Sequence, residues 1–371
     1  MTVTGAARGE IMAPMTARFT RRAGLVAGAA FVATASGAHA DESTGRGTLR
    51  DLADARGIRI GAAVASRPLA NEPVYRETLA REFSSVTCEN VMKPSFIQPA
   101  ADTFDFQASD AIVAFATAHN MTVRGHTLVW HQQNPAWLER VAAVGDNPAG
   151  ALRDHIFGVV RHYRNDGPAP VPVWDVVNEA VTDNGLMRDT LWSRALGPRY
   201  LADAFRWAHE ADPDSRLFYN DFGAEGMNRK ANAVHAMLRD LIRDGVPVHG
   251  VGLQMHVGIG AGHAPSVTDL AANIARLRAL GLDVHVTEMD VKLQKGTGGD
   301  EARRTDQAQV YADVLGTCLE AGVTSFTLWG FTDAHSWIPS FTGKPDGGLP
   351  FDDAYEPKPA YHALARVLAG D

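Results

Sequence analysis

Short apolar segments rich in β-branched residues alternate eight times with longer segments of helical periodicity, and this alternation constrains the fold more than any other feature of the chain. The expected strands are Ile58–Val64, Ser85–Cys88, Thr122–Thr127, Val173–Val177, Leu217–Tyr219, Gly250–Gln254, Val284–Thr287 and Ser325–Leu328. The expected helices span residues 72–82, 108–119, 149–164, 199–210, 228–243, 267–280, 303–321 and 358–369. Eight strand–helix pairs in one unbroken series predict an α/β protein, built as a single (β/α)8 TIM barrel.

Residues 41–371 are expected to form one catalytic domain, because no Pro/Ser/Thr-rich linker or change of composition interrupts them. The hydrophobic content of the chain, 45%, is sufficient for the large core of a barrel. Cys88 and Cys318, the two cysteines, fall in an expected strand and an expected helix. This placement favours two buried free thiols over a disulfide.

Residues 1–40 have the features of an N-terminal export signal that is removed. The pair Arg21-Arg22 precedes an apolar run rich in alanine and glycine, and Ala38-His39-Ala40 is an A-x-A cleavage site. The paired arginines and the weakly hydrophobic run favour a twin-arginine signal over a general secretory one, which predicts a periplasmic or secreted protein. The run is too short to cross a bilayer, so we expect no membrane anchor.

The acidic charge of the chain limits its expected partners. The formal net charge is −8, and removal of residues 1–40, with four arginines and one glutamate, changes it to −11. Acidic proteins are poorly suited to nucleic acids and anionic membranes, and we expect neither as a partner. A neutral polymer suits this charge better.

Polar and aromatic residues recur where the expected strands end, and in a barrel these carboxyl ends face the active site. They are Glu89-Asn90, His126, Trp130-His131, Asn178-Glu179, Asn220-Asp221, Gln254, His256, Glu288, Asp290 and Trp329. A hydrogen-bonded core histidine, or an aromatic ring closing the barrel mouth, would explain any one of them. Their joint placement at one face indicates a functional site.

Two glutamates at separate strand ends, Glu179 and Glu288, indicate the chemistry of that site. Hydrolysis of an acetal needs one carboxyl group to protonate the leaving oxygen and a second to attack the anomeric carbon or activate water. Taken alone, each glutamate is equally compatible with a strand that ends in solvent. The surrounding residues favour the catalytic interpretation.

A neutral polysaccharide offers hydroxyl groups and weakly apolar ring faces, so its site needs aromatic platforms and hydrogen-bonding side chains. Candidate platforms are Trp130, Trp329 and Trp337, whereas Trp192 and Trp207 lie in or near helix-like segments and are better interpreted as core residues. The candidate hydrogen-bonding residues are Glu89, Asn90, Lys93, His126, Gln133 and Gln254.

Zinc-dependent hydrolysis is the main chemical competitor, since the chain contains several candidate ligands. They are His126, His131, His256, His285 and His335, and none belongs to an H-E-x-x-H motif. The sequence also lacks a G-x-S-x-G elbow, a phosphate-binding glycine loop and a dinucleotide fingerprint. We therefore expect neither a metal nor a cofactor.

At the level of motifs, the chain resembles the xylanases of glycoside hydrolase family 10. The blocks that carry the resemblance are residues 85–93 (SVTCENVMK), 124–131 (RGHTLVWH), 174–179 (WDVVNE), 252–256 (GLQMH), 286–290 (VTEMD) and 327–333 (TLWGFTD). Six blocks in the family's order make this a specific signal that extends through the expected barrel.

The resemblance implies a retaining endo-1,4-β-xylanase that cleaves internal linkages of xylan or xylo-oligosaccharides by double displacement. By position, Glu179 would be the acid/base and Glu288 the nucleophile. His256 would contact the nucleophile and be held by Asp290. The other implied site residues are Glu89, Asn90, Lys93, His126, Trp130 and Gln133 on the glycone side, Asn178 and Gln254 near the reacting sugar, and Trp329 and Trp337 walling the glycone end.

The sequence departs from the family pattern on the leaving-group side. Asn220-Asp221-Phe222-Gly223 stands where the family has Asn-Asp-Tyr-Asn, which removes a hydroxyl and an amide and predicts weaker binding there. Two smaller departures are Cys88, where the family often has Ala or Pro, and Pro94, where it often has Trp.

Two alternatives remain open, a related β-1,4-glucanase or cellobiohydrolase-type barrel and a non-catalytic carbohydrate-binding protein. Trp329 and Trp337 disfavour glucan, because their bulk would crowd the hydroxymethyl group that glucose has and xylose lacks. The presence of both carboxylates disfavours a protein that only binds. We expect a monomer.

Overall fold

The computed structural model describes residues 47–145 and 147–371, and its centre is a ring of parallel strands. The ring consists of β1 (Arg59–Val64), β2 (Ser85–Cys88), β3 (Thr122–Val129), β4 (Val173–Asn178), β5 (Arg216–Asp221), β6 (Gly250–Leu253), β8 (Asp283–Lys292) and β9 (Ser325–Leu328). It closes through the pairing of β9 with β1 and of β6 with β8. The predicted (β/α)8 barrel is thereby confirmed.

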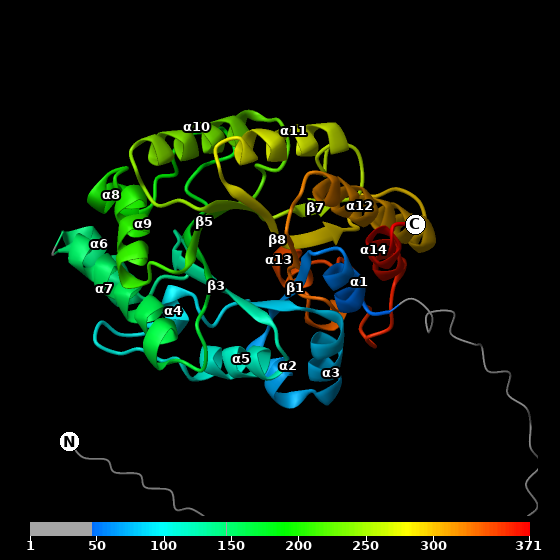
Figure 1. Ribbon diagram of the computed structural model, residues 1–371, viewed down its shortest axis with the longest axis horizontal. Coiled ribbons are helices and arrows are strands. Elements are labelled where there is room, and N and C mark those ends of the chain that lie inside the picture. The colour runs from blue at the N-terminus through cyan, green and yellow to red at the C-terminus, as the bar shows by residue number, and fades with distance from the viewer. Residues whose placement is uncertain (1–46, 146) are drawn as a thin grey trace, which may run out of the picture. The chain divides into compact units, whose positions relative to one another are not determined.

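Helices surround the strand ring (Figure 1). The helices that follow the eight strands are α3 (Pro73–Glu82), α5 (Gln107–Ala118), α7 (Pro148–Arg161), α9 (Tyr200–Ala211), α10 (Arg229–Arg243), α11 (Val267–Arg278), α12 (Asp300–Glu320) and α14 (Pro359–Ala369). Each agrees with an expected helix to within a few residues. The last helix, α14, packs against α12 and against α1 (Leu49–Ala55), so the end of the described chain returns to its beginning.

Additional short elements lie in the connections, where periodicity gives little signal. They are α2 (Ser66–Asn71), α4 (Pro94–Ile97), α6 (Ala136–Val144), α8 (Leu191–Leu196), α13 (Ile338–Thr342), the π-helical turn His162–Asp166, the 3-10 turn Asp333–His335 and β7 (His256–Gly258). β7 pairs in parallel with the far end of β8, with His256 opposite Asp290. This pairing extends β8 to Lys292, whereas the sequence predicted a strand that ends at Thr287.

The core fills the barrel and the layer between strands and helices. Trp174 of β4 is 1% exposed, and it packs directly over Gly125 of β3, where a Cβ atom would lie only 2.2 Å from the indole ring. Trp192 is buried and Trp207 packs against the core, so both are core residues as expected. Cys88 and Cys318 are buried free thiols, which confirms that prediction.

The predicted export signal, residues 1–40, lies outside the described residues. Within residues 47–145 and 147–371, no helix is sufficiently long and apolar to cross a membrane.

Candidate active site

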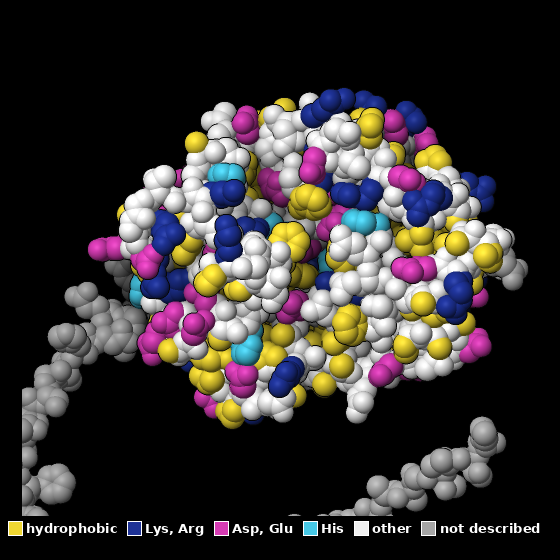
Figure 2. Space-filling view, turned by 180° about the vertical axis from the view of Figure 1, so that it is seen from behind, with side chains coloured by type: hydrophobic (Ala, Val, Ile, Leu, Met, Phe, Trp, Pro, Cys, Tyr) yellow, Lys and Arg dark blue, Asp and Glu magenta, His cyan; other side chains and the backbone are white. Residues whose placement is uncertain are grey.

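A cavity of about 480 Å³ is formed by side chains from the carboxyl ends of the strands and the loops that follow them. All the predicted site residues line it except Asp290, which lies behind His256. Four further lining residues, Gln132, Phe222, Lys292 and Phe341, were not among the predicted site residues. The face in Figure 2 is hollowed near its centre, and basic, acidic and hydrophobic side chains are interspersed around the hollow.

Glu288 lies within β8 and is 4% exposed. Its Oε1 accepts a hydrogen bond from Asn220 Nδ2 at 2.6 Å, and its Oε2 lies 3.2 Å from His256 Nε2. Burial acts to raise the pKa of this carboxyl group, but the nearby charge of His126 and the contact with His256 outweigh burial and lower it. Glu288 is therefore held as a carboxylate.

His256 joins Glu288 to a second carboxylate. Its Nδ1 lies 2.8 Å from Oδ2 of the fully buried Asp290. Burial opposes the charged imidazolium, but the charge of Asp290 and the hydrogen bonds to both carboxylates raise the pKa of His256 to about 10. Because the ring is protonated at neutral pH, it donates an N–H to each carboxylate.

Asp290 is fixed from two further directions. Trp337 Nε1 donates to its Oδ2 at 2.7 Å, and Lys292 Nζ lies 3.3 Å from its Oδ1. Burial acts to raise the pKa of Asp290, whereas the charge of His256 lowers it below its usual range. Trp337 thus serves two purposes, since the same indole lines the cavity and orients the carboxylate that holds His256.

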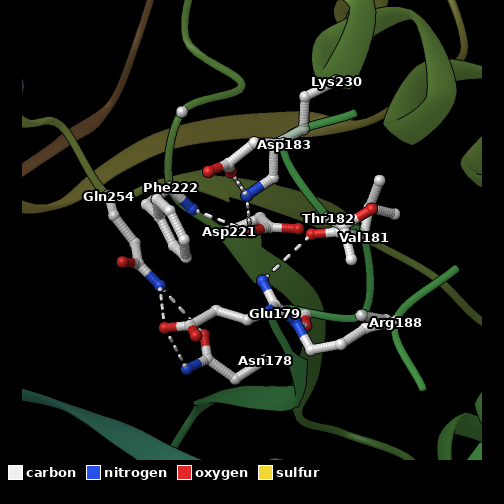
Figure 3. Close-up of polar contacts among 12 residues, drawn as sticks. Asn178, Glu179, Val181, Thr182, Asp183, Arg188, Asp221, Phe222, Lys230 and Gln254 are labelled. Carbon is white, nitrogen blue, oxygen red and sulfur yellow. Dashed lines mark hydrogen bonds and ion pairs between the residues drawn. The ribbon is translucent and has the colours of Figure 1, made fainter. Parts of the chain in front are cut away.

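Glu179, the residue after β4, has a different environment (Figure 3). Its Oε1 accepts hydrogen bonds from Asn178 Nδ2 at 3.2 Å and Gln254 Nε2 at 3.1 Å. His131 Nδ1 lies 3.8 Å from its Oε2, and burial lowers the pKa of that histidine. The hydrogen-bond donors to this carboxyl group are two neutral amides, and the neighbouring histidine is biased towards its neutral form, whereas Glu288 contacts an imidazolium.

A chain of amide side chains connects the two glutamates. Asn220 Nδ2 donates to Glu288 and also to Asn178 Oδ1 at 2.9 Å, and Asn178 in turn donates to Glu179. Asn220 is fully buried, and its own Oδ1 accepts from Thr287 at 2.7 Å. The sequence placed Asn220 at a strand end but did not select it as a site residue.

A polar cluster with aromatic neighbours occupies another wall of the cavity. Lys93 Nζ donates to Asn90 Oδ1 at 3.0 Å, and Asn90 Nδ2 donates to Glu89 Oε1 at 3.2 Å. The same ammonium group lies 5.1 Å from the ring centroid of Trp130 and 5.8 Å from that of Trp329. Burial raises the pKa of Glu89 and lowers that of Lys93. Closely spaced donors and acceptors beside indole rings are the groups that a sugar ring needs.

His126 is oriented by a buried ion pair that no sequence pattern indicated. Its Nδ1 lies 3.0 Å from Asp175 Oδ2, and Asp175 also pairs with Arg124. Burial acts to raise the pKa of Asp175, but the adjacent Arg124 charge lowers it. Asp175 and Arg124 are interior residues of β4 and β3, so nothing in the strand pattern distinguished them from core positions.

The histidines considered as zinc ligands are not gathered into one site. His285 lies 3.2 Å from Arg124, and His335 pairs with Glu72 at 3.0 Å, whereas His126, His131 and His256 each contact a carboxylate of the cavity or its support. In the part of the chain that the structure describes, no group of three or more His, Cys, Asp or Glu residues is arranged to hold a metal ion.

Comparison with known proteins gives a consistent match. The family model described as Glycosyl hydrolase family 10 matches residues 48–367. The chain is 39% identical to endo-1,4-beta-xylanase B of Thermotoga neapolitana, over 86% of this chain and 91% of that protein. It is also 35% identical to exoglucanase XynX of Acetivibrio thermocellus, over 82% of this chain but only 28% of that longer protein.

The fold comparison agrees with the sequence comparison. The crystal structure of xylanase 10B from Thermotoga petrophila in complex with xylobiose matches with a TM-score of 0.81 and 40% identity. The match covers 87% of this chain and 97% of that one.

Proposed function

This chain belongs to glycosyl hydrolase family 10, and on that premise we propose that it is a retaining endo-1,4-β-xylanase that acts through Glu179 and Glu288. The observation that carries the assignment of these residues is their connection within one cavity. Asn220 and Asn178 join the two carboxyl groups by consecutive hydrogen bonds, while only Glu288 is paired with an imidazolium. Two carboxyl groups in unlike environments are suited to unlike roles.

Glu288 is the proposed nucleophile, because His256 and Asn220 both stabilise its ionised form. Glu179 is the proposed acid/base, because its carboxyl group lies in the same cavity and accepts hydrogen bonds from neutral amides. In the first step Glu179 protonates the glycosidic oxygen while Glu288 attacks the anomeric carbon and forms a glycosyl-enzyme. In the second step Glu179, now ionised, removes a proton from water, which attacks the anomeric carbon and releases Glu288.

Xylan and xylo-oligosaccharides are the proposed substrates. The named xylanase relative and the neighbour complexed with xylobiose support this choice. The cavity supports it too, since Trp329 and Trp337 both line the space around Glu288 and would crowd a hydroxymethyl group. Because one relative is named an exoglucanase, β-1,4-glucan is the substrate against which xylan should be compared.

The neighbours of Glu89, Asn90 and Lys93 support the proposed glycone side. Trp130, Gln133 and Trp329 line the same wall, and Lys93 lies within 6 Å of both indole rings. On the leaving-group side, Phe222 presents a ring without a hydroxyl.

We also propose that the protein is exported, acts as a monomer, and binds neither nucleic acid nor membranes. Export rests on the twin-arginine pattern of residues 1–40, and the remaining points rest on the acidic charge. Replacement of Arg21 and Arg22 by lysine should keep the protein in the cytoplasm of an expressing bacterium, and export of this variant would argue against a twin-arginine signal.

The proposed function is tested by the substrate and by the first product formed. The enzyme should release xylo-oligosaccharides from xylan at a kcat/KM at least about a hundredfold above that for β-1,4-glucan. Proton NMR should show the β-anomer as the first product. Preference for glucan would overturn the substrate, and an initial α-anomer would overturn the double displacement.

A further inference from the structure

The backbone of Glu179 is held in a conformation that glutamate rarely adopts, with φ at 59°. Such a conformation persists only where neighbouring groups stabilise it. Arg188 Nε donates to the carbonyl oxygen of Glu179 at 2.9 Å, and the N–H of Ala180 donates to the hydroxyl oxygen of Tyr219 at 3.0 Å. The carbonyl and the N–H of the peptide group that follows Glu179 are therefore both anchored.

The anchor provided by Tyr219 depends on a buried carboxylate. Tyr219 is fully buried, and its hydroxyl donates to Oδ2 of Asp221 while it accepts from Ala180. A hydroxyl has one proton, so donation to Asp221 directs a lone pair towards the Ala180 N–H. Asp221 thereby determines how the hydroxyl meets the peptide next to Glu179.

Asp221 is in turn paired with a lysine that lies outside the catalytic cavity (Figure 3). Lys230, in the first turn of α10, is 2% exposed, and its Nζ lies 2.9 Å from Asp221 Oδ1. Burial raises the pKa of Asp221 to about 7, and the Lys230 charge opposes that rise. The buried carboxylate is thus stabilised by this ammonium group.

Lys230 also contacts the loops that follow β4 and β5. Its Nζ lies 3.4 Å from Oδ1 of Asp183, in the loop after β4, and 3.6 Å from the ring centroid of Phe222, which lines the cavity. The mechanism proposed above uses neither Lys230 nor Asp221. Burial of two charged groups is costly, so the Asp221–Lys230 pair is expected to have a role beyond stability, and it lies near the strained backbone of Glu179.

We propose that the buried Asp221–Lys230 pair positions the acid/base Glu179 through the hydroxyl of Tyr219. The three residues are positioning residues, since none of them is among the residues that line the cavity. This inference rests on the proposed role of Glu179. It adds that Glu179 is supported through Lys230, Asp221 and Tyr219. Glu288 is supported by different residues, Asn220 and His256.

The proposal predicts a selective defect. A displaced Glu179 protonates the leaving oxygen poorly, whereas attack by Glu288 is unaffected because its contacts come from Asn220, His126 and His256. Substrates with poor leaving groups should suffer, and substrates whose leaving group needs no proton should not.

The test compares kcat/KM for xylotetraose with kcat/KM for the dinitrophenyl glycoside of xylobiose. Tyr219→Phe removes only the hydroxyl, and it should lower kcat/KM for xylotetraose about ten- to a hundredfold while changing that for the dinitrophenyl substrate by less than about twofold. Tyr163→Phe is the matched control, since Tyr163 is equally buried but its hydroxyl donates to Ser109, away from the cavity. It should change neither value.

Lys230→Met tests the other end of the same chain. It should show the same selectivity, and the Tyr219→Phe/Lys230→Met double variant should lose no more than the more impaired single variant, since both changes break one line of contacts. Multiplied losses would contradict a single chain. Equal losses of Tyr219→Phe on both substrates, or no loss on either, would overturn the proposal.

Glu179→Ala separates this inference from the proposed function. If Glu179→Ala spares the dinitrophenyl substrate but Tyr219→Phe shows no selectivity, only the positioning inference fails. If Glu179→Ala itself impairs both substrates equally, the acid/base assignment fails.

Discussion

Nε2 of His256 lies 3.2 Å from Oε2 of Glu288, while Nδ1 of the same ring lies 2.8 Å from Asp290. The imidazolium therefore lies between two carboxylates and satisfies both. This contact distinguishes Glu288 from Glu179, whose Oε1 accepts hydrogen bonds from two neutral amides. The division of the two glutamates into nucleophile and acid/base depends on this difference.

His256 should make the stability of the protein fall at alkaline pH. Its pKa is about 10 in the folded protein, against an ordinary value of 6.5, so the folded state binds the proton more tightly than the unfolded state. The resulting stabilisation is complete below pH 6.5 and is lost as the pH rises towards 10. The free energy of unfolding, measured by denaturant titration between pH 6.5 and 10, should therefore decline.

His256→Gln is the comparison for that decline. This variant should be less stable than the wild type at pH 6.5, because Glu288 and Asp290 lose the cation between them, and the difference should narrow towards pH 10. A difference that stays constant over this range would show that His256 is neutral in the folded protein.

The two glutamates should differ in kinetic tests. Glu288→Ala should abolish turnover on every substrate, because no other group replaces the nucleophile. Glu179→Ala should reduce kcat/KM for xylotetraose by about 10²–10⁴-fold but spare it for an aryl glycoside with a good leaving group. The measurement is kcat/KM of both variants on xylotetraose and on the aryl glycoside. Equal losses of kcat/KM in the two variants on the aryl glycoside would reject the assigned roles.

Metal removal should leave the enzyme active. Each role in the double displacement is assigned to a side chain of the described cavity, so treatment with a chelator and dialysis should not change kcat/KM on xylan. Activity that disappears on chelation and returns only with added zinc would direct attention back to the histidines.

Phe222→Tyr should strengthen binding on the leaving-group side. The ring of Phe222 lines the cavity and rests against Lys230, so an added hydroxyl extends from a fixed ring. One hydrogen bond to a sugar hydroxyl should lower KM for xylotetraose about two- to tenfold. An aryl xylobioside has no sugar on the leaving-group side and serves as the control substrate. An equal fall in KM for this substrate would show that residue 222 does not act on the leaving-group side.

The sequence predicted the barrel because each strand and most helices carry their own periodic signal. The strand ends also indicated most of the cavity, since a parallel ring brings residues as distant as Glu89 and Trp337 to one face. Phe341, by contrast, lies in the short helix α13 within a long connection, where no periodicity indicates which side chains return to the cavity.

The supporting residues were harder to predict for a different reason. Asp175 and Lys230 lie in an ordinary strand and an ordinary helix, and their importance depends on partners that only the closed barrel supplies. Asn220 is the penultimate residue of β5, and an asparagine there carries no chemical signature until its partners Asn178 and Glu288 are known. Charge pairing across the barrel is tertiary information.

The most direct test of the account is to trap the glycosyl-enzyme. Incubation with a 2-deoxy-2-fluoro xylobioside that bears a good leaving group should add one 2-deoxy-2-fluoroxylobiosyl mass to the protein. The fluorine slows both formation and hydrolysis of the intermediate, whereas the good leaving group speeds only its formation, so the intermediate accumulates. Peptide mass spectrometry should locate this mass on Glu288. A label on another residue, or turnover of the reagent with no covalent adduct, would contradict attack by Glu288.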